Sequence, residues 1–234
     1  MLPSHSEDPL TYLPRKPLVE YAKGREIYNS RRKNTYLFVV IKGRVKVSAA
    51  SDEGCQTIGR IVTAEGLFGE SCLVEQAAAH DELALALDPV ALMAWSAGEV
   101  LQQIEREPWL GVALAQYLAR QCQEMQDRIE SMAVHKTPER VMLALLQLAG
   151  GLGAATGDTG IARLASLTHQ TIAEFVGTSR EIVTFQMNRL RRAGFIHYSR
   201  QYLDIGTEAI ENHLREKGVR VPARQSAPAR RAAG

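Results

Sequence analysis

The sequence contains few cysteines, and it has no long apolar segment. The three cysteines are too few and too scattered for a disulfide framework or a CxxC-type metal site. No segment approaches the roughly 20 consecutive apolar residues of a membrane span, and residues 1–8 lack the basic and apolar pattern of a secretory signal. These absences predict a reduced, cytoplasmic chain without a membrane partner.

The sequence also lacks the motifs that mark common catalytic sites. It contains no GxSxG elbow, HExxH motif, P-loop or dinucleotide-binding fingerprint. His80, His169 and His197 do not have the spacing of metal ligands. We therefore expect no enzyme activity, no metal and no cofactor.

The net charge is small, but it is unevenly distributed. The 234 residues carry a formal charge of +2, and their 45% hydrophobic content is that of a globular protein. Residues 1–136 hold 15 basic and 18 acidic residues, whereas residues 137–234 hold 13 basic and 8 acidic residues. A basic second part is expected when that part binds nucleic acid, although a basic surface without a partner has the same composition.

Short strands separated by turns are predicted for the first part. Residues 36–41 are apolar and rich in β-branched and aromatic side chains, and Val45 and Val47 alternate with polar residues. Further strands are predicted at residues 57–62 and within residues 84–93. This spacing favours a sandwich or barrel of antiparallel hairpins.

From residue 96 the apolar period becomes that of helices. Ser96 and Glu99 have the spacing of a capping box, which predicts a short helix over 97–105. Pro108 opens a helix of about 25 residues, which is either a dimer helix or a helix lying on its own β domain. Its apolar seam comprises Leu110, Leu114, Leu118, Gln121, Met125, Ile129 and Met132.

A boundary between two parts is predicted near residue 136. Thr137 is a good N-cap, Pro138 suits the first helical position, and Glu139 complements the helix dipole. The helix predicted from this start covers residues 138–149 and ends at Gly150-Gly151.

Two short helices joined by a glycine-containing turn follow. Thr168 is the expected cap of the first helix, and Gly177 ends it by accepting a left-handed backbone. Thr178 and Glu181 then have capping-box spacing for the second helix, with Ile182, Val183, Met187 and Leu190 pointing inward. This pair predicts a helix-turn-helix, and a hairpin predicted over 195–205 indicates the winged version.

In a helix-turn-helix the first residues of the second helix enter the major groove of DNA. Arg180 can donate two hydrogen bonds to guanine, and Glu181 can accept one from cytosine. Ser179, beside the start of this helix, suits a phosphate. The predicted DNA contacts are Thr168, His169, Gln170, Ser179, Arg180, Glu181, Thr184, Phe185, Asn188 and Arg200, which lies at the hairpin tip.

Over roughly residues 15–208 the chain resembles the cyclic-AMP receptor protein/FNR (CRP/FNR) family of bacterial transcription regulators. Residues 36–47 look like the family's first roll hairpin, residues 66–70 like the start of its phosphate-binding cassette, and residues 167–183 like its helix-turn-helix signature. The resemblance implies a homodimer on a palindromic operator in double-stranded DNA, with recognition helices about 34 Å apart. RNA polymerase is a further implied partner if the protein is an activator.

The implied fold class is α+β, with three functional parts and a tail. A cyclic-nucleotide-binding-like β-roll (jelly roll) forms the sensor domain over 1–106, and a dimerisation helix and hinge cover 107–136. A winged-helix DNA-binding domain covers 137–217. The tail over 218–234 holds four arginines and no acidic residue, and we expect it to be disordered.

The chain departs from the family's cyclic-nucleotide-binding members. In those members an Arg-Ser pair follows the Gly-Glu pair by about ten residues, but here His80-Asp81 follow Gly69-Glu70, and no Lys or Arg lies between Arg60 and Arg106. A buried phosphate would lack a cation, so we expect a regulator that cyclic AMP does not control. The candidate effector-pocket residues are Gly69, Glu70, Ser71, Cys72, His80, Asp81, Met125 and Gln126.

The recognition helix also departs from part of the family. Members of the family that prefer a TGTGA-like half-site carry a second Arg where Phe185 stands, so Phe185 is expected to touch a thymine methyl instead.

Two alternatives for the control of DNA binding remain open from the sequence. The protein is either ligand-independent or controlled by an unknown effector. The alternative function is an effector-, haem- or redox-responsive regulator that needs its signal to bind DNA. Cys72, His80 and Met125 are the candidate haem ligands, and Cys72 or Cys122 is the candidate redox thiol.

Overall fold

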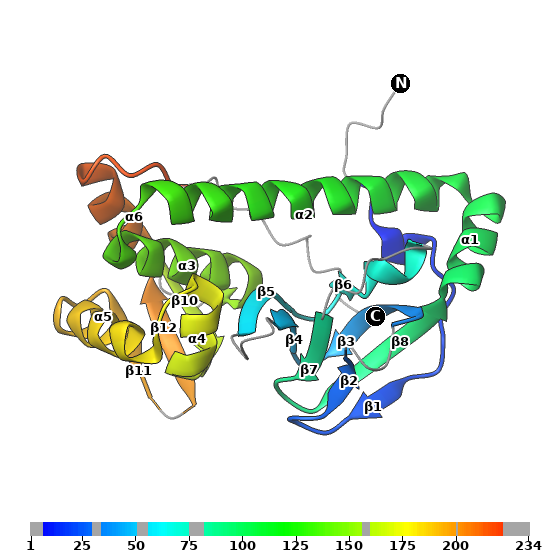
Figure 1. The fold of residues 1–234 in the computed structure, drawn as a ribbon, viewed down its shortest axis with the longest axis horizontal. Coiled ribbons are helices and arrows are strands. Elements are labelled where there is room, and N and C mark those ends of the chain that lie inside the picture. The colour runs from blue at the N-terminus through cyan, green and yellow to red at the C-terminus, as the bar shows by residue number, and fades with distance from the viewer. Residues whose placement is uncertain are drawn as a thin grey trace. The chain divides into compact units, whose positions relative to one another are not determined.

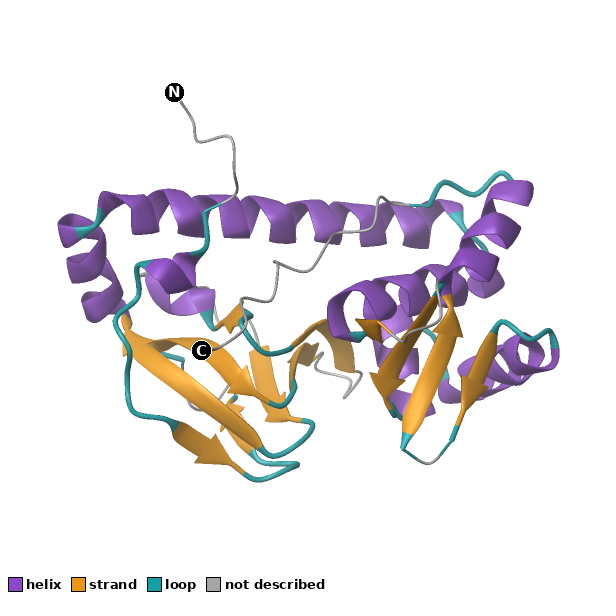
Figure 2. Cartoon of the chain, turned by 180° about the vertical axis from the view of Figure 1, so that it is seen from behind, coloured by secondary structure: helices purple, strands orange, loops and turns teal. Residues whose placement is uncertain are grey.

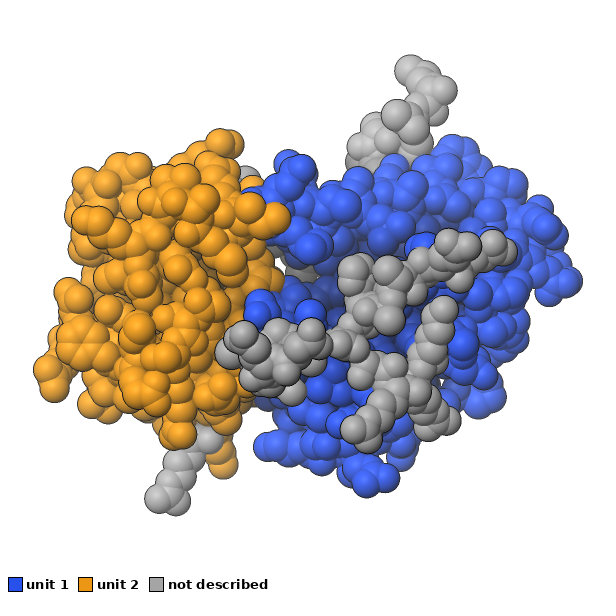
Figure 3. Space-filling model, in the orientation of Figure 1, with its two compact units in different colours: residues 1–126 blue, residues 127–234 orange. Residues whose placement is uncertain are grey.

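The computed structural model describes residues 7–29, 34–50, 56–74, 82–155, 160–199 and 201–221 (Figure 1). The chain divides into two compact units, residues 1–126 and residues 127–234 (Figure 3). The division falls within the long helix α2 (Pro108–Val134), so its last turns belong to the second unit. His80, Asp81, Arg200 and the tail beyond residue 221 lie outside the described residues.

Two four-stranded antiparallel sheets form the β part of the first unit (Figure 2). In order across the first sheet, the strands are β1 (Val19–Tyr21), β8 (Val90–Ser96), β3 (Tyr36–Lys42) and β6 (Leu67–Phe68). In the second sheet they are β2 (Glu26–Tyr28), β7 (Glu82–Ala86), β4 (Val45–Ala50) and β5 (Gln56–Val62).

The inner faces of these two sheets pack into one core. Phe38 and Phe68 from the first sheet stack with ring centroids 4.9 Å apart, and Tyr28 from the second sheet lies 6.0 Å from Phe38. Val45 and Val47 of β4 are buried in the same core. The alternation of apolar residues that predicted half-buried strands therefore reflects two sheets facing each other, as in a β-roll.

The pairing predicted for the hairpin over residues 36–47 is wrong. β3 pairs with β8 and β6, whereas β4 pairs with β5 and β7, so the two strands belong to different sheets. Gly43 between them has φ 88°, and a Cβ there would lie 2.5 Å from the carbonyl oxygen of Pro89. Apolar alternation fixes which face of a strand is buried, but it does not choose the neighbouring strand.

Helix α1 (Ala97–Arg106) confirms the predicted capping box. Oγ of Ser96 accepts a hydrogen bond from the Glu99 backbone, and the Glu99 carboxylate accepts one from the Ser96 backbone at 2.9 Å. The first unit also contains the short 3-10 helices η1 (Pro9–Thr11) and η2 (Glu70–Leu73). Helix α2 begins at Pro108 as predicted.

The second unit is a set of helices beside a small antiparallel sheet. The sheet order is β11 (Ile196–Tyr198), β12 (Tyr202–Gly206), β10 (Ile161–Ala165) and β9 (Ala154–Ala155), which confirms the predicted hairpin and pairs it with β10. The helices are α3 (Thr137–Leu152), α4 (His169–Val176), α5 (Arg180–Arg192) and α6 (Thr207–Glu216).

Two boundaries in this unit differ from the prediction, and one helix was missed. Lys136, not Thr137, is the N-cap of α3, and the helix continues through Gly150-Gly151 to Leu152. Glycine lowers helix stability by only about 1 kcal/mol, and packing can offset that loss. Helix α6 was not predicted, although its apolar residues Ile210 and Leu214 have helical spacing and are fully buried.

Candidate nucleic-acid interface

Helix α4 is the first helix of the predicted helix-turn-helix, and both of its ends are as expected. Oγ1 of Thr168 accepts a hydrogen bond from the Thr171 backbone at 3.0 Å. Gly177 has φ 72°, and its N–H donates to the carbonyl of Ala173 at 2.9 Å. A β-branched or bulky residue would be strained at this φ, so the glycine permits the tight turn into α5.

Helix α5 begins one residue later than predicted. Ser179, not Thr178, is its N-cap, because Oγ of Ser179 accepts a hydrogen bond from the Ile182 backbone at 3.3 Å. Glu181 is therefore the second helical residue. Hydrogen bonds to its carboxylate, first from its own backbone and then from Ser179, hold the pKa of Glu181 below its usual value. The carboxylate stays ionised and can accept a hydrogen bond from a base.

One face of α5 is exposed along its length. Arg180, Glu181, Phe185 and Arg189 lie on this face, which we call the reading face. Phe185 exposes 61% of its surface, an unusual value for a large apolar residue. The guanidinium of Arg189 lies 5.9 Å from the centre of the Phe185 ring. The reading face thus combines two cations, one carboxylate and one aromatic ring.

The prediction for the inner face of α5 is partly wrong. Val183, Met187 and Leu190 are buried as expected, but Ile182 is 42% exposed. Gln186 is buried in its place. The buried residues of α5 have the i, i+3, i+4, i+7 spacing of one helix face, namely Val183, Gln186, Met187 and Leu190. Ile182, one residue before Val183, lies off that face.

Two predicted contact residues of α5 are bonded within the protein. Oγ1 of Thr184 lies 2.9 Å from Nδ1 of His169 and donates to the carbonyl of Arg180 at 2.8 Å. The hydroxyl of Tyr198 on β11 donates to Oδ1 of Asn188 at 3.4 Å. These bonds tie α5 to α4 and to the hairpin, so His169 and Tyr198 help to hold the reading face in place.

The start of α4 brings three predicted contacts together. Thr168 and Gln170 are exposed, and His169 between them is half-buried. The amide of Gln170 donates to Glu174 at 3.0 Å. Arg200, expected at the hairpin tip, lies outside the described residues.

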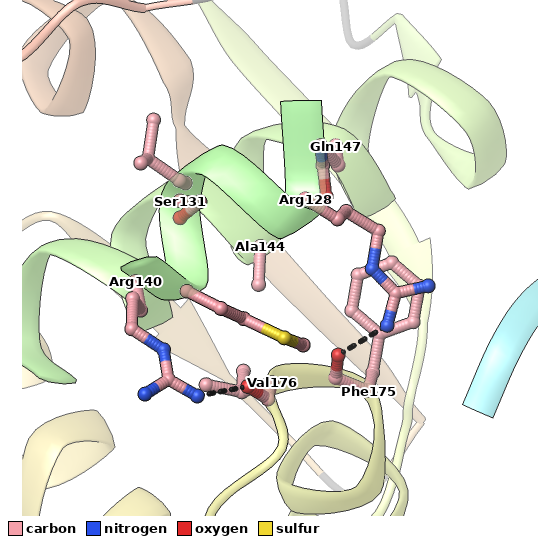
Figure 4. Close-up of a pocket in the computed structure, with 9 residues that line it drawn as sticks. Arg128, Ser131, Arg140, Ala144, Gln147, Phe175 and Val176 are labelled. Carbon is pink, nitrogen blue, oxygen red and sulfur yellow. Dashed lines mark hydrogen bonds between the residues drawn. The ribbon is translucent and has the colours of Figure 1, made fainter. Parts of the chain in front are cut away.

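Two arginines missed by the sequence analysis bind the end of α4 (Figure 4). Arg128 of α2 donates to the carbonyl of Phe175 at 2.8 Å, with its guanidinium 4.5 Å from the ring centre. Arg140 of α3 donates to the carbonyls of Val176 at 2.6 Å and Gly177 at 3.0 Å. A helix C-terminus attracts cations, but the sequence does not indicate which arginines will reach it.

The predicted effector-pocket residues lie in two places. Gly69 precedes η2, which carries Glu70, Ser71 and Cys72. Glu70 forms an ion pair with Arg60, and burial followed by the charge of Glu70 raises the pKa of Cys72 to about 11. The other two described candidates, Met125 and Gln126, are exposed on α2, and the remaining two, His80 and Asp81, lie outside the described residues.

The exposed apolar seam of α2 is shorter than predicted, because its first two residues are buried. Leu110 and Leu114 are buried against Leu37 and Trp95 of the same chain, so they cannot contact a second chain. The N-terminal part of α2 therefore lies on its own β domain, which was the alternative interpretation. The remaining apolar seam residues are all exposed, namely Leu118, Met125, Ile129 and Met132, while Gln121 is half-buried.

Neither a membrane helix nor a metal cluster occurs in the part of the chain that the structure describes. No helix there is long and apolar enough to cross a bilayer. The same residues contain no group of three or more His, Cys, Asp or Glu side chains able to hold a metal ion.

Two family models match the chain, one in each half. The cyclic nucleotide-binding domain matches residues 18–107, and the Crp-like helix-turn-helix domain matches residues 139–207. Among curated proteins, the transcriptional regulator SdrP of Thermus thermophilus is 32% identical over 157 residues, which are 67% of this chain and 72% of that protein. The CRP-like cAMP-activated global transcriptional regulator of Mycobacterium tuberculosis is 26% identical over 186 residues, 76% of this chain and 79% of the relative.

A solved structure has the same architecture. A CRP/FNR-family transcriptional regulator of Thermus thermophilus matches with a TM-score of 0.65 at 27% identity, covering 84% of this chain and 97% of that one. The resemblance inferred from residues 36–47, 66–70 and 167–183 is therefore confirmed, as is the fold of a β-roll, a long helix and a winged helix-turn-helix. This chain belongs to the CRP/FNR family of transcription regulators.

Proposed function

We propose that this protein is a non-enzymatic regulator that acts in the cytoplasm by binding a palindromic operator as a homodimer. The reading face of α5 carries this proposal, because it exposes hydrogen-bonding side chains on a helix fixed by a cap and by bonds from α4 and β11. If the protein activates transcription, RNA polymerase is its further partner. We assign residues 1–106 to the sensor, 107–136 to the dimer helix and hinge, 137–217 to DNA binding, and 218–234 to a basic tail.

The reading face supports a specific pattern of base recognition. Arg180 pairs with a guanine and Glu181 with a cytosine, as their donor and acceptor groups require. Phe185 contacts a thymine methyl, which suits an exposed apolar ring. Ser179 caps the helix, and with Thr168, His169 and Gln170 it lies where phosphates flank the groove. We assign Arg200 to a further phosphate.

The exposed seam of α2 supports the homodimer. Leu118, Met125 and Met132 recur every seven residues, and Ile129 lies between the last two on the same stripe. Cys122, which is also exposed, is placed one heptad before Ile129. In a parallel pair of helices these positions alternate at the contact, so a second copy of α2 covers them.

The heptad spacing gives a prediction about Cys122. In the proposed dimer, Cys122 of each protomer faces its equivalent, so mild oxidation with copper phenanthroline should produce a disulfide-linked dimer on a non-reducing gel. Replacing Cys122 with serine should abolish the crosslink. Cys72 is half-buried and its high pKa keeps the thiol protonated, so it should not form the crosslink instead. Cys55, which lies outside the described residues, is replaced by serine in both proteins. A chain that crosslinks equally well after the Cys122→Ser change would argue against this seam.

The segment that resembles the family's phosphate-binding cassette argues against cyclic AMP as the effector. A phosphate there needs a cation, but residues 61–105 contain no Lys or Arg, and the guanidinium of Arg60 is paired with Glu70. Several relatives are named as cAMP-activated, but we propose that this chain is ligand-independent or uses another effector. The high pKa of the Cys72 thiol gives no support to Cys72 as a redox-sensing residue.

One experiment separates these alternatives. The purified protein without added ligand is expected to select a palindromic duplex from a random-sequence library and to bind it with unchanged affinity when cyclic AMP is added. If selection succeeds only with cyclic AMP, the effector assignment is wrong. If no duplex is selected under either condition, or with other nucleotides, the operator-binding proposal is itself contradicted.

A further inference from the structure

His169 lies between the first helix of the helix-turn-helix and the recognition helix. Its Nδ1 is 2.9 Å from Oγ1 of Thr184, and that hydroxyl donates its one proton to the carbonyl of Arg180. The Thr184 oxygen must therefore accept from His169, so Nδ1 carries the imidazole proton. In its neutral form, His169 presents a lone pair and no proton at Nε2.

The His169 ring is only partly buried. Its Nε2 is not one of the described side-chain atoms that are buried without a partner. In the described structure, Arg180 and Thr184 of α5 and Tyr198 of β11 face the ring. Burial, followed by the positive charge of Arg180, lowers the pKa of His169. The free protein therefore holds this side chain neutral at neutral pH.

We propose that DNA binding is coupled to the uptake of one proton by His169, whose Nε2–H then donates to a backbone phosphate. The proposal rests on the operator binding proposed above. His169 is bonded to Thr184, which in turn bonds to Arg180, and both of these residues belong to the recognition helix. Because Arg180 is on the reading face, we expect His169 to lie beside the phosphates that flank the major groove. A neutral ring would direct its lone pair at an anion, whereas the protonated ring makes a charge-assisted hydrogen bond.

A phosphate beside the ring counteracts the positive charge of Arg180. The pKa of His169 is therefore higher in the complex than in the free protein. Between these two pKa values the complex holds a proton that the free protein lacks. DNA affinity accordingly falls as pH rises through that interval, by at most about tenfold for each pH unit and each protomer, or about 100-fold for a dimer that takes up two protons.

The test uses the full chain and a duplex that it selects from a random-sequence library. Affinity is measured by fluorescence anisotropy from about pH 6 to about pH 8 at constant salt, because salt changes phosphate binding strongly. His169→Asn keeps an amide donor toward Thr184 and does not titrate, whereas His169→Arg carries a permanent charge. We expect the wild-type affinity to fall with pH by about threefold to tenfold more than that of either variant.

The outcomes distinguish the two proposals. If no duplex is selected, operator binding fails and proton coupling fails with it. If a duplex is selected but His169→Asn keeps the full wild-type pH dependence, proton coupling alone is overturned. The other histidines are common to all three proteins, so the difference in slope reports His169. In the wild type, ring proton signals in nuclear magnetic resonance spectra should titrate at higher pH in the complex, and an unchanged midpoint would also overturn the proposal.

Discussion

Replacing Ile129 with glutamate is expected to convert the protein into a monomer. Ile129 exposes 64% of its surface in the single chain and lies between Met125 and Met132 on the proposed seam. In the dimer the substitution would bury two like-charged carboxylates beside each other, which costs several kcal/mol. Sedimentation velocity at micromolar concentration should show the mass of one chain.

The same variant should lose operator binding by about 100-fold or more, because a dimer gains affinity by engaging two half-sites at once. Gln123→Glu is the matched control. It adds the same charge to an exposed position of α2 that is not on the seam, so it should leave the dimer and its DNA binding intact. If Ile129→Glu sediments as a dimer, the seam assignment is wrong.

Replacing Arg180 with alanine is expected to cost about 1–3 kcal/mol of affinity for each half-site, or roughly 5-fold to 150-fold per half-site. Arg180 is exposed in the first turn of α5, where a side chain can reach base edges. Losing a bidentate contact to guanine removes discrimination at one base pair of each half-site. Binding-site selection with the variant should therefore give a motif relaxed at that base and unchanged elsewhere.

Arg192→Ala is the control for charge. Arg192 is exposed at the far end of the same helix, so its loss removes one positive charge without removing a base contact. We expect a smaller loss that is uniform across sequences. The recognition assignment is contradicted if Arg180→Ala and Arg192→Ala behave alike.

Local signals in the sequence predicted local structure well. The cap at Ser96, the cap at Thr168 and the turn at Gly177 each depend on residues within four positions of each other, and each is confirmed. Strand pairing depends on residues far apart in the chain, so the sequence did not reveal that β3 and β4 separate into different sheets. The bonds from Arg128 and Arg140 to α4 were missed for the same reason.

The start of α5 shows where a local signal is ambiguous. Thr178 and Ser179 are both good caps, and only Thr178 has a glutamate three residues later. In the structure Ser179 caps the helix and also bonds to Glu181, so one serine satisfies both groups. Arg180 and Glu181 are still in the first turn of α5, so their predicted role in base contacts does not depend on which residue caps the helix.

Arg128 and Ile129 are neighbours on α2, and this adjacency has a consequence for operator geometry. Arg128 anchors the helix-turn-helix through Phe175, while Ile129 is on the seam proposed to meet the second copy. Both residues belong to the second unit. In the proposed dimer, the distance between the two half-sites is thus set by α2 and its contact with α4, outside the sensor assigned to residues 1–106. Exchanging the sensor for one that responds to a different signal should then leave the operator spacing unchanged.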